Sequence, residues 1–221
     1  MAFFIGVILP YFTLAIFVGG MFYQLARLAR VPLHLHWELF PYPESLGAQL
    51  GELVSEVVSL RSIYRHKRKL WGRSLLMHWG IYLQVFWLIM VLFGGRGYAW
   101  LGMVGGLACL SGALSLVLFR YVDPEMRRIS TPADYLNLLL VGSVSLVALL
   151  TGFYFQEAAF QRYLWGILSF RPVPPSTGSF LLNLFLIQVF LLVLPFGRMA
   201  HFAAKYFTYH KVKWGEVRRH A

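Results

Sequence analysis

The sequence has few charged residues and almost no cysteine. Charged side chains make up 13% of the 221 residues, about half the share of a typical soluble domain, and only nine residues are acidic. The single cysteine, Cys109, excludes an intrachain disulfide and any cysteine-rich zinc or iron–sulfur site. A CxxCH motif is also missing, so a covalently attached c-type haem is not expected in this chain.

Charge is absent from the start of the chain. Residues 1–26 contain no charged side chain, and the first basic residues are Arg27 and Arg30. A cleavable signal peptide has the opposite order, with positive charge first and a small-residue cleavage site last. We therefore expect the first apolar run to be a retained membrane helix with its N-terminus outside.

Long hydrophobic runs dominate the rest of the sequence. Apolar residues make up 58% of the chain, and a bilayer core needs roughly 20 apolar residues per helix. Five runs reach that length, which predicts an all-α integral membrane protein with five transmembrane helices in one bundle, residues 1–221. The expected helices lie near 4–28, 74–94, 98–120, 134–155 and 180–206.

Basic residues are distributed unequally between the connecting loops. The formal net charge is +11, and 17 of the 20 Lys and Arg residues fall on the side of segment 27–73 and the C-terminal end. By the positive-inside rule this asymmetry places the N-terminus out and the C-terminus in, with the loop 29–73 in the cytoplasm. The asymmetry explains the charge better than nucleic-acid binding does, and we expect no nucleic-acid partner.

Two connecting segments have patterns of their own. Near 49–64, apolar residues recur at helical spacing, which predicts an amphipathic helix that either lies on the membrane surface or docks a cytoplasmic partner. The outer loop 156–178 is rich in aromatic residues and ends in prolines, so we expect it in the membrane interface.

Two of the seven histidines lie inside hydrophobic runs. His78 and His201 occur at the ends of their runs that are flanked by Lys and Arg, although the chain crosses the membrane there in opposite directions. Two neutral imidazoles at one depth are suited to clamp a haem iron; the alternative is a pair of interfacial histidines bonded to neighbours or water. The pair His34 and His36 is expected in a solvated basic loop.

Arg198 lies one helical turn before His201. A guanidinium group pairs well with a carboxylate, so Arg198 is a candidate partner for a haem propionate. Its alternative role is a basic anchor whose charged end reaches the membrane surface.

Three sequence segments resemble a known family: LLMHWGIYLQVFWLIM, ISTPADYLNLLLVGSVSLVALLTG and LLNLFLIQVFLLVLPFGRMAH. They are similar to the cytochrome b (gamma) subunit of respiratory nitrate reductase. The most specific matches are Pro195-Phe196-x-Arg198-x-x-His201 and Thr131-x-Ala133-Asp134. The N-terminal third resembles the related membrane subunits of the sulfite-reductase-associated (Dsr), tetrahaem-cytochrome (Tmc) and heterodisulfide-reductase complexes. The resemblance implies haem b, quinone chemistry and a cytoplasmic iron–sulfur partner.

The chain departs from the family pattern in its outer half. The nitrate reductase subunit carries two haems, and His78 and His201 correspond to the ligands of the inner one. The outer pair is expected ten residues after His78 and eighteen before His201, where this chain has Leu88 and Asn183. Leucine cannot ligate iron and asparagine is a poor haem ligand. We therefore predict one haem b.

With one haem, quinone must bind close to it or another subunit must bridge the gap. The space of the missing haem is a candidate quinone site, with Asn183, Gln188 or Tyr82 as hydrogen-bond partners; alternatively, these side chains bond between helices.

The sequence thus predicts a haem b subunit of a quinone-linked oxidoreductase complex in the inner (cytoplasmic) membrane. It would exchange electrons between the menaquinone pool and a cytoplasmic iron–sulfur subunit, and a periplasmic multihaem cytochrome c is a possible further partner. The alternative is a haem-free membrane anchor for a soluble redox complex.

Overall fold

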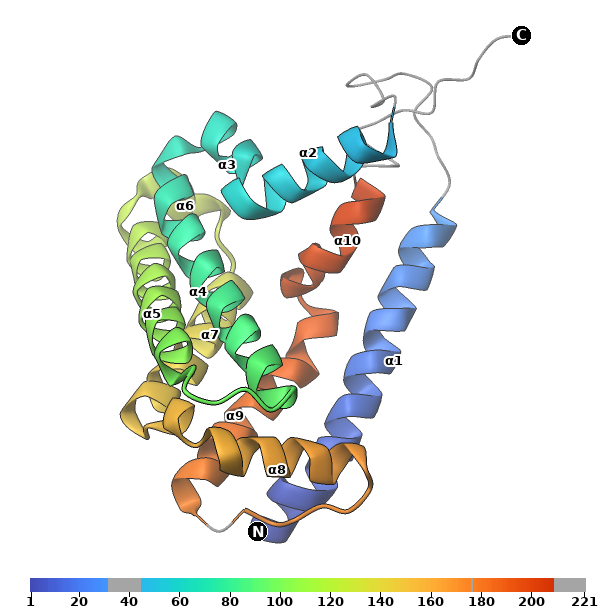
Figure 1. Ribbon diagram of the computed structural model, residues 1–221. Coiled ribbons are helices and arrows are strands. Elements are labelled where there is room, and N and C mark those ends of the chain that lie inside the picture. The colour runs from blue at the N-terminus through green and yellow to red at the C-terminus, as the bar shows by residue number, and fades with distance from the viewer. Residues whose placement is uncertain (32–44, 176, 209–221) are drawn as a thin grey trace, which may run out of the picture.

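The computed structural model describes residues 1–31, 45–175 and 177–208, and these are helical almost throughout (Figure 1). Five segments are long and apolar enough to cross a membrane, as predicted: Phe4–Arg30, Arg68–Leu92, Ala99–Val122, Pro132–Leu150 and Gly178–Phe196. The first combines a π-helical turn, η1 (Phe4–Ile8), with α1 (Leu9–Arg30), and the next three are α4, α5 and α7. The last combines α9 (Gly178–Val193) with a 3-10 turn, η3 (Leu194–Phe196).

Three spans have a boundary that differs from the predicted one by five residues or more. Helix α4 begins at Arg68, because the basic residues before Ser74 continue the helix toward the membrane surface. Helix α7 ends at Leu150, where Gly152 takes a positive φ of 63° and a short helix, η2 (Phe153–Phe155), follows. The fifth predicted run is divided into α9, η3, η4 (Arg198–Ala200) and α10 (His201–Thr208).

The spanning helices pack in the order α4, α5, α7, α9, α1. Figure 1 shows α4, α5 and α7 on one side and α1 with α10 on the other. Within the described part of the chain, α4 makes no extensive contact with α9 or α10. The helices that carry the two candidate histidines are therefore held through their neighbours rather than against each other.

Helices α4 and α5 approach closely because two glycines remove the side chains between them. A Cβ atom at Gly80 would overlap the backbone of Cys109, and one at Gly112 would overlap the backbone of Met77. Small residues allow such close approach in membranes, where packing replaces the hydrophobic effect as the driving force. Cys109 is buried at this contact, with 1% of its surface exposed.

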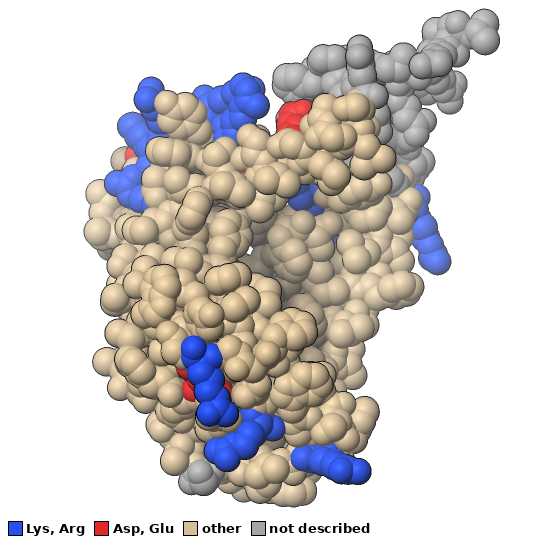
Figure 2. Space-filling model, in the orientation of Figure 1, with Lys and Arg blue, Asp and Glu red and all other residues tan. Residues whose placement is uncertain are grey.

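Short helices cover both ends of the bundle. At one end, which we call the basic end, lie α2 (Leu46–Ser59), α3 (Arg61–His66), α6 (Pro124–Ile129) and α10. At the opposite end α8 (Glu157–Leu168) lies across the bundle (Figure 1). Figure 2 shows Lys and Arg side chains gathered at both ends and a tan band without them between.

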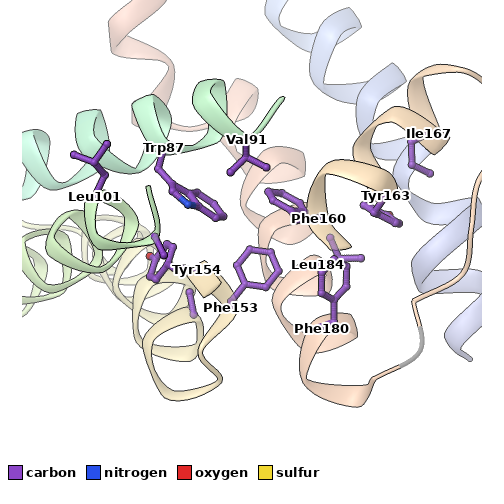
Figure 3. Packing of buried hydrophobic residues seen from close by; sticks show 12 residues of the cluster. Trp87, Val91, Leu101, Phe153, Tyr154, Phe160, Tyr163, Ile167, Phe180 and Leu184 are labelled. Atoms are coloured by element: carbon purple, nitrogen blue, oxygen red, sulfur yellow. The ribbon is translucent and has the colours of Figure 1, made fainter. Parts of the chain in front are cut away.

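The opposite half of the bundle is filled by an aromatic cluster, consisting of Trp87, Phe153, Tyr154, Phe160, Tyr163 and Phe180 (Figure 3). The rings of Trp87 in α4 and Phe160 in α8 stack with their centroids 5.7 Å apart. Phe153 lies 4.9 Å from Phe160 and 5.3 Å from Phe180, so the cluster joins four elements. Stacked and edge-on rings add about 0.5–1.5 kcal/mol per pair beyond their burial.

Helix α8 was not predicted as a helix from the sequence. Its first residue, Glu157, accepts hydrogen bonds from the backbone N–H groups of Gly97 (2.8 Å) and Tyr98 (2.9 Å) in the α4–α5 turn. Trp165 donates to the carbonyl of Leu92 at 2.9 Å, while Tyr163 is buried in the aromatic cluster. Within the segment predicted to lie in the membrane interface, helix α8 thus covers one end of the bundle.

Candidate haem site

The structure brings His78 and His201 together at the basic half of the bundle. Their ring centroids are 6.0 Å apart, with an angle of 72° between the ring planes. His78 is half-buried on α4, and His201 is the exposed first residue of α10. The other histidine pair singled out in the sequence, His34 and His36, lies outside the described residues.

The position of His201 depends on the break after α9. Pro195 has no backbone N–H to continue the helix, and Gly197 is extended, with φ −103° and ψ 177°. The break packs on α1: Gln24 donates its Nε2 to the Pro195 carbonyl at 3.0 Å, and a Cβ at Gly20 would lie 2.8 Å from Pro195 Cβ. Helix α10 therefore begins in a direction set by α1.

Both imidazoles are oriented by backbone carbonyls. His78 Nδ1 donates to the Ser74 carbonyl at 2.7 Å, and His201 Nδ1 donates to the Arg198 carbonyl at 2.9 Å. A carbonyl oxygen only accepts, so each Nδ1 carries the proton and each neutral ring keeps its lone pair on Nε2. Metal-bound histidines commonly have this arrangement, which fixes the ring and makes it a stronger ligand.

The spacing of the two rings fits a bis-imidazole metal site. A metal–imidazole bond of about 2 Å on each side, added to the distance from Nε2 to the ring centre, separates two axial centroids by roughly 6 Å. The observed separation is 6.0 Å. Axial rings can rotate about their metal bonds, so an angle of 72° is compatible with ligation.

Among the described residues, no group of three or more His, Cys, Asp or Glu side chains is placed to hold a metal ion. A metal held by these two histidines alone needs its other ligands from a bound group. Haem supplies four ring nitrogens in one plane and leaves the two axial positions to the protein. The residues present therefore fit haem.

The two histidines belong to helices on either side of a hollow in the protein surface. Figure 2 shows this hollow at the centre of the face, and Figure 1 shows α4 and α10 flanking it in the same orientation. Tyr82, one turn after His78, has its ring centre 6.3 Å from that of His78. The space next to the pair is thus bounded by ring side chains of α4.

Helix α2 lies across the basic end between α4 and α10 (Figure 1). The carbonyl groups of the last turn of α2 have no hydrogen-bond partner within that helix. Three aromatic side chains of α4 donate hydrogen bonds to them. The three bonds are Tyr82 Oη to Val57 O (2.9 Å), Trp79 Nε1 to Val58 O (3.0 Å) and Trp71 Nε1 to Ser59 O (2.7 Å).

On the side of α10, an ion pair connects α2 to α10. Lys205 Nζ lies 3.3 Å from Glu56 Oε1, and Glu56 also accepts from the backbone N–H of Ser62 at 2.9 Å. Glu56 is buried, while Leu50 and Val54 of α2 are exposed. The sequence predicted one amphipathic helix near 49–64, whereas the structure divides it at Leu60, with φ 51°, into α2 and α3. Glu56, one of two acidic residues of α2, faces the bundle, and part of the apolar face of α2 is exposed.

Arg198 is 70% exposed and forms an ion pair with Asp134 at the start of α7. Its Nη1 donates to Oδ1 at 2.9 Å and to Oδ2 at 3.1 Å. Asp134 also accepts from the backbone N–H and the hydroxyl of Thr131, which completes the N-terminal cap of α7. The two specific sequence motifs therefore contact each other, and Arg198 already has a carboxylate partner.

The three candidate quinone residues are tied to different segments. Tyr82 bonds to α2, as described above. Asn183, 2% exposed, donates to Thr151 Oγ1 at 2.7 Å and to the Ser179 carbonyl at 2.8 Å. Gln188 donates to the Ile5 carbonyl in η1 at 3.0 Å. Each side chain makes the intramolecular bonds that were the alternative reading of the sequence, and these bonds do not assemble the three into one site.

The two positions expected for a second histidine pair differ in their surroundings. Leu88 is 36% exposed, whereas Asn183 is buried beside Phe180 and Leu184, two members of the buried core. The interior there is occupied by the aromatic cluster.

A polar network in the centre of the bundle was not predicted from the sequence. Tyr154 donates to Gln84 Oε1 at 2.7 Å, and Gln84 bonds to Ser145 at 3.3 Å. A Cβ at Gly106 would lie 2.7 Å from the Tyr154 hydroxyl, so a glycine makes room for this side chain. The glycines of the third hydrophobic run indicate that a neighbouring group packs closely there. The sequence does not show that this group is the ring of Tyr154.

Fold and site together define a multi-pass α-helical membrane protein with a paired-histidine centre between two of its helices. Residues 96–220 match the family described as nitrate reductase gamma subunit, more than half of the chain, and the protein belongs to this family. It is accordingly a membrane cytochrome b subunit that transfers electrons within a redox complex. The matched range includes His201, while His78 precedes it. None of the curated proteins matches the chain.

Proposed function

We propose that the chain binds one haem b between His78 and His201 and exchanges electrons between menaquinone and an iron–sulfur subunit. The observation that carries the proposal is the 6.0 Å ring separation, together with both Nδ1 atoms bonded to carbonyls. Haem, when bound, supplies a one-electron couple. The enzyme activity of the complex would belong to the partner subunits.

The protein's own residues would hold and tune the group. His78 and His201 would donate their Nε2 lone pairs, and their Nδ1–H bonds to Ser74 and Arg198 would keep both rings in the ligating tautomer. Arg198 is bonded to Asp134, so its part in propionate binding would require sharing that ion pair. Helix α2 would cover the site from the basic end.

A single haem is supported by the aromatic cluster. Leu88 and Asn183 stand where a second histidine pair is expected, and six aromatic side chains fill the interior near them. A second haem would have to displace several of these buried rings. Truncating even one buried aromatic side chain typically lowers the free energy of unfolding by about 3–5 kcal/mol.

The proposed orientation follows from loop charge. The basic end would face the cytoplasm and the N-terminus would lie outside, in the inner membrane of the cell. The iron–sulfur subunit would then dock on the basic end, where α3 carries Arg61 and Arg65. A multihaem cytochrome c, if part of the complex, would contact the end covered by α8.

The test is a reduced-minus-oxidised absorption spectrum of the purified protein, with pyridine haemochrome analysis to count haem. We expect a b-type band and one haem per chain, both lost in His78→Ala and in His201→Ala. His66→Ala is the matched control, because His66 also bonds its Nδ1 to a carbonyl four residues earlier, at 2.9 Å, but is exposed on α3. Haem retention in either ligand variant would overturn the assignment, and a protein without any b-type band would instead be a haem-free anchor.

A further inference from the structure

A cavity of about 350 Å³ lies between α1 and the segment around the start of α10. Its walls come only from these two parts of the chain, and α4 contributes none of them. His201 borders the cavity and also faces His78, whose ring centre is 6.0 Å away. One side of the His201 segment therefore meets the candidate haem site and the other meets this cavity.

The walls combine apolar surface with nitrogen donors and contain no acidic side chain. The lining residues are Gln24, Leu25, Arg27, Leu28, Phe196, Gly197, Arg198, Ala200, His201, Ala203 and Ala204. Of the two guanidinium groups, that of Arg198 is paired with Asp134. Arg27 is exposed and has no ion-pair partner within the described ranges. Gln24 uses one of its two amide hydrogens on the Pro195 carbonyl, which leaves the other available.

We propose that this cavity binds the ring of an isoprenoid quinone, an inference that rests on the proposed function. A quinone ring is flat and apolar and carries carbonyl oxygens that accept hydrogen bonds, which matches leucine and phenylalanine walls with donors from Arg27 and Gln24. The volume is within the usual range of roughly 300–1,000 Å³ for small-molecule sites. The location, on the wall formed by a haem ligand, gives electrons a short path.

With a single haem, quinone must bind close to that haem, and the cavity provides a site next to a proposed haem ligand. The opposite half of the bundle is filled by the aromatic cluster, whereas this space borders His201 directly. A bound hydroquinone would lose two electrons and two protons to become the quinone. A haem held by His78 and His201 would supply the one-electron acceptor for these electrons, and the protons would leave to water at the basic end beside the exposed Arg27.

Basic cavities between membrane helices can also bind the phosphate of an anionic lipid. Two features favour the quinone. First, the cavity borders His201, a proposed haem ligand, which suits a ligand that exchanges electrons. Second, Arg27 is the one guanidinium group in the lining that is not in an ion pair, whereas a phosphate site usually gathers several positive charges.

The test is equilibrium binding of menadione, a naphthoquinone without a tail, to the haem-loaded protein. Arg27→Gln removes the charged donor, and Ala203→Phe fills the cavity without changing charge. We expect the Kd for menadione to rise about tenfold or more in both. Arg27→Gln loses one charge-assisted hydrogen bond, and in Ala203→Phe the new ring takes the space of the quinone. Arg30→Gln, on the same helix but outside the lining, is the matched control and should leave Kd unchanged.

Two further readouts separate the outcomes. Haem content and the dithionite-reduced spectrum should be unchanged in all three variants, which separates a loss of quinone binding from a disturbed haem site. Absence of a b-type band from the unchanged protein would count against the proposed function and not against the cavity. An unchanged menadione Kd in Arg27→Gln and Ala203→Phe would overturn the quinone site. Loss of bound phosphatidylglycerol in Arg27→Gln by native mass spectrometry, with menadione binding unaltered, would overturn it in favour of a lipid site.

Discussion

Arg198 and Asp134 form an ion pair that connects the turn before α10 to the first turn of α7. The same Arg198 accepts, through its backbone carbonyl, the Nδ1–H of His201. Asp134 meanwhile caps α7 through Thr131. One ion pair therefore links a helix cap to the orientation of a candidate haem ligand, and both motifs recognised in the sequence serve this one contact.

Substitution of Asp134 should weaken the fold more than loss of an ordinary surface ion pair. Asp134→Ala removes both the ion pair and the cap, and loss of an N-terminal cap typically costs about 1 kcal/mol. The ion pair itself adds little, since Arg198 is 70% exposed and exposed pairs contribute roughly 0–1 kcal/mol. Thermal unfolding followed by circular dichroism should show a lower Tm for Asp134→Ala than for Asp134→Asn, because the amide oxygen can still accept from Thr131. Equal Tm values for the two variants would contradict the capping role.

Two glycines of α4 should respond oppositely to alanine. Gly80→Ala places a Cβ on the backbone of Cys109 and should destabilise the bundle by roughly 1–3 kcal/mol through overpacking. At Gly72, no neighbouring atom lies within 4 Å of where a Cβ would stand, so Gly72→Ala should be neutral or stabilise α4 by up to about 1 kcal/mol. Thermal stability in detergent measures both. A fold that tolerates Gly80→Ala as well as Gly72→Ala would mean that α4 and α5 are less tightly packed than described.

The aromatic donors of α4 should hold the end of α2 in place. Replacing Trp79 and Tyr82 together by Phe removes the hydrogen bonds to Val58 and Val57 while keeping two rings. Hydrogen–deuterium exchange in residues 46–59 should become faster, because the last turn of α2 loses two of its three aromatic hydrogen-bond donors. Tyr23→Phe, at an exposed ring on α1, is the control and should leave exchange in α2 unchanged.

Tyr82→Phe alone also distinguishes two roles of that hydroxyl. If Tyr82 serves the α2 contact, menadione binding should be unaffected by its loss. Weaker menadione binding in this variant would return Tyr82 to the list of quinone partners.

A second haem should not be restored by its histidines alone. In Leu88→His combined with Asn183→His, one histidine would start from a 36% exposed position and the other from within the buried core. The aromatic cluster still occupies the interior, so pyridine haemochrome analysis should give one haem per chain, the number proposed for the unchanged protein. Two haems per chain in the double variant would show that the cluster can open at little cost.

Several features were predictable from the sequence because they depend on local composition. A helix long and apolar enough to cross a membrane is a property of one segment, so all five spans were predicted. The special histidines and the family were recognised from short motifs, and the family match over residues 96–220 confirms the latter. The division of the fifth run at Pro195 and Gly197 was missed, although both residue types commonly end helices.

Other features depend on contacts between distant segments, which no local pattern specifies. Tertiary structure decided that Arg198 pairs with Asp134, that Glu56 of α2 pairs with Lys205, and that Glu157–Leu168 form a helix over an aromatic cluster. The same holds for the two histidines. The sequence by itself determined that each lies at the basic end of an apolar run. The 6.0 Å separation of their rings was determined only by the packing of α4, α5, α7, α9 and α1, and by the contact of the Pro195–Gly197 break with α1. That distance depends on how the side chains of several helices fit together, which no single segment of sequence specifies.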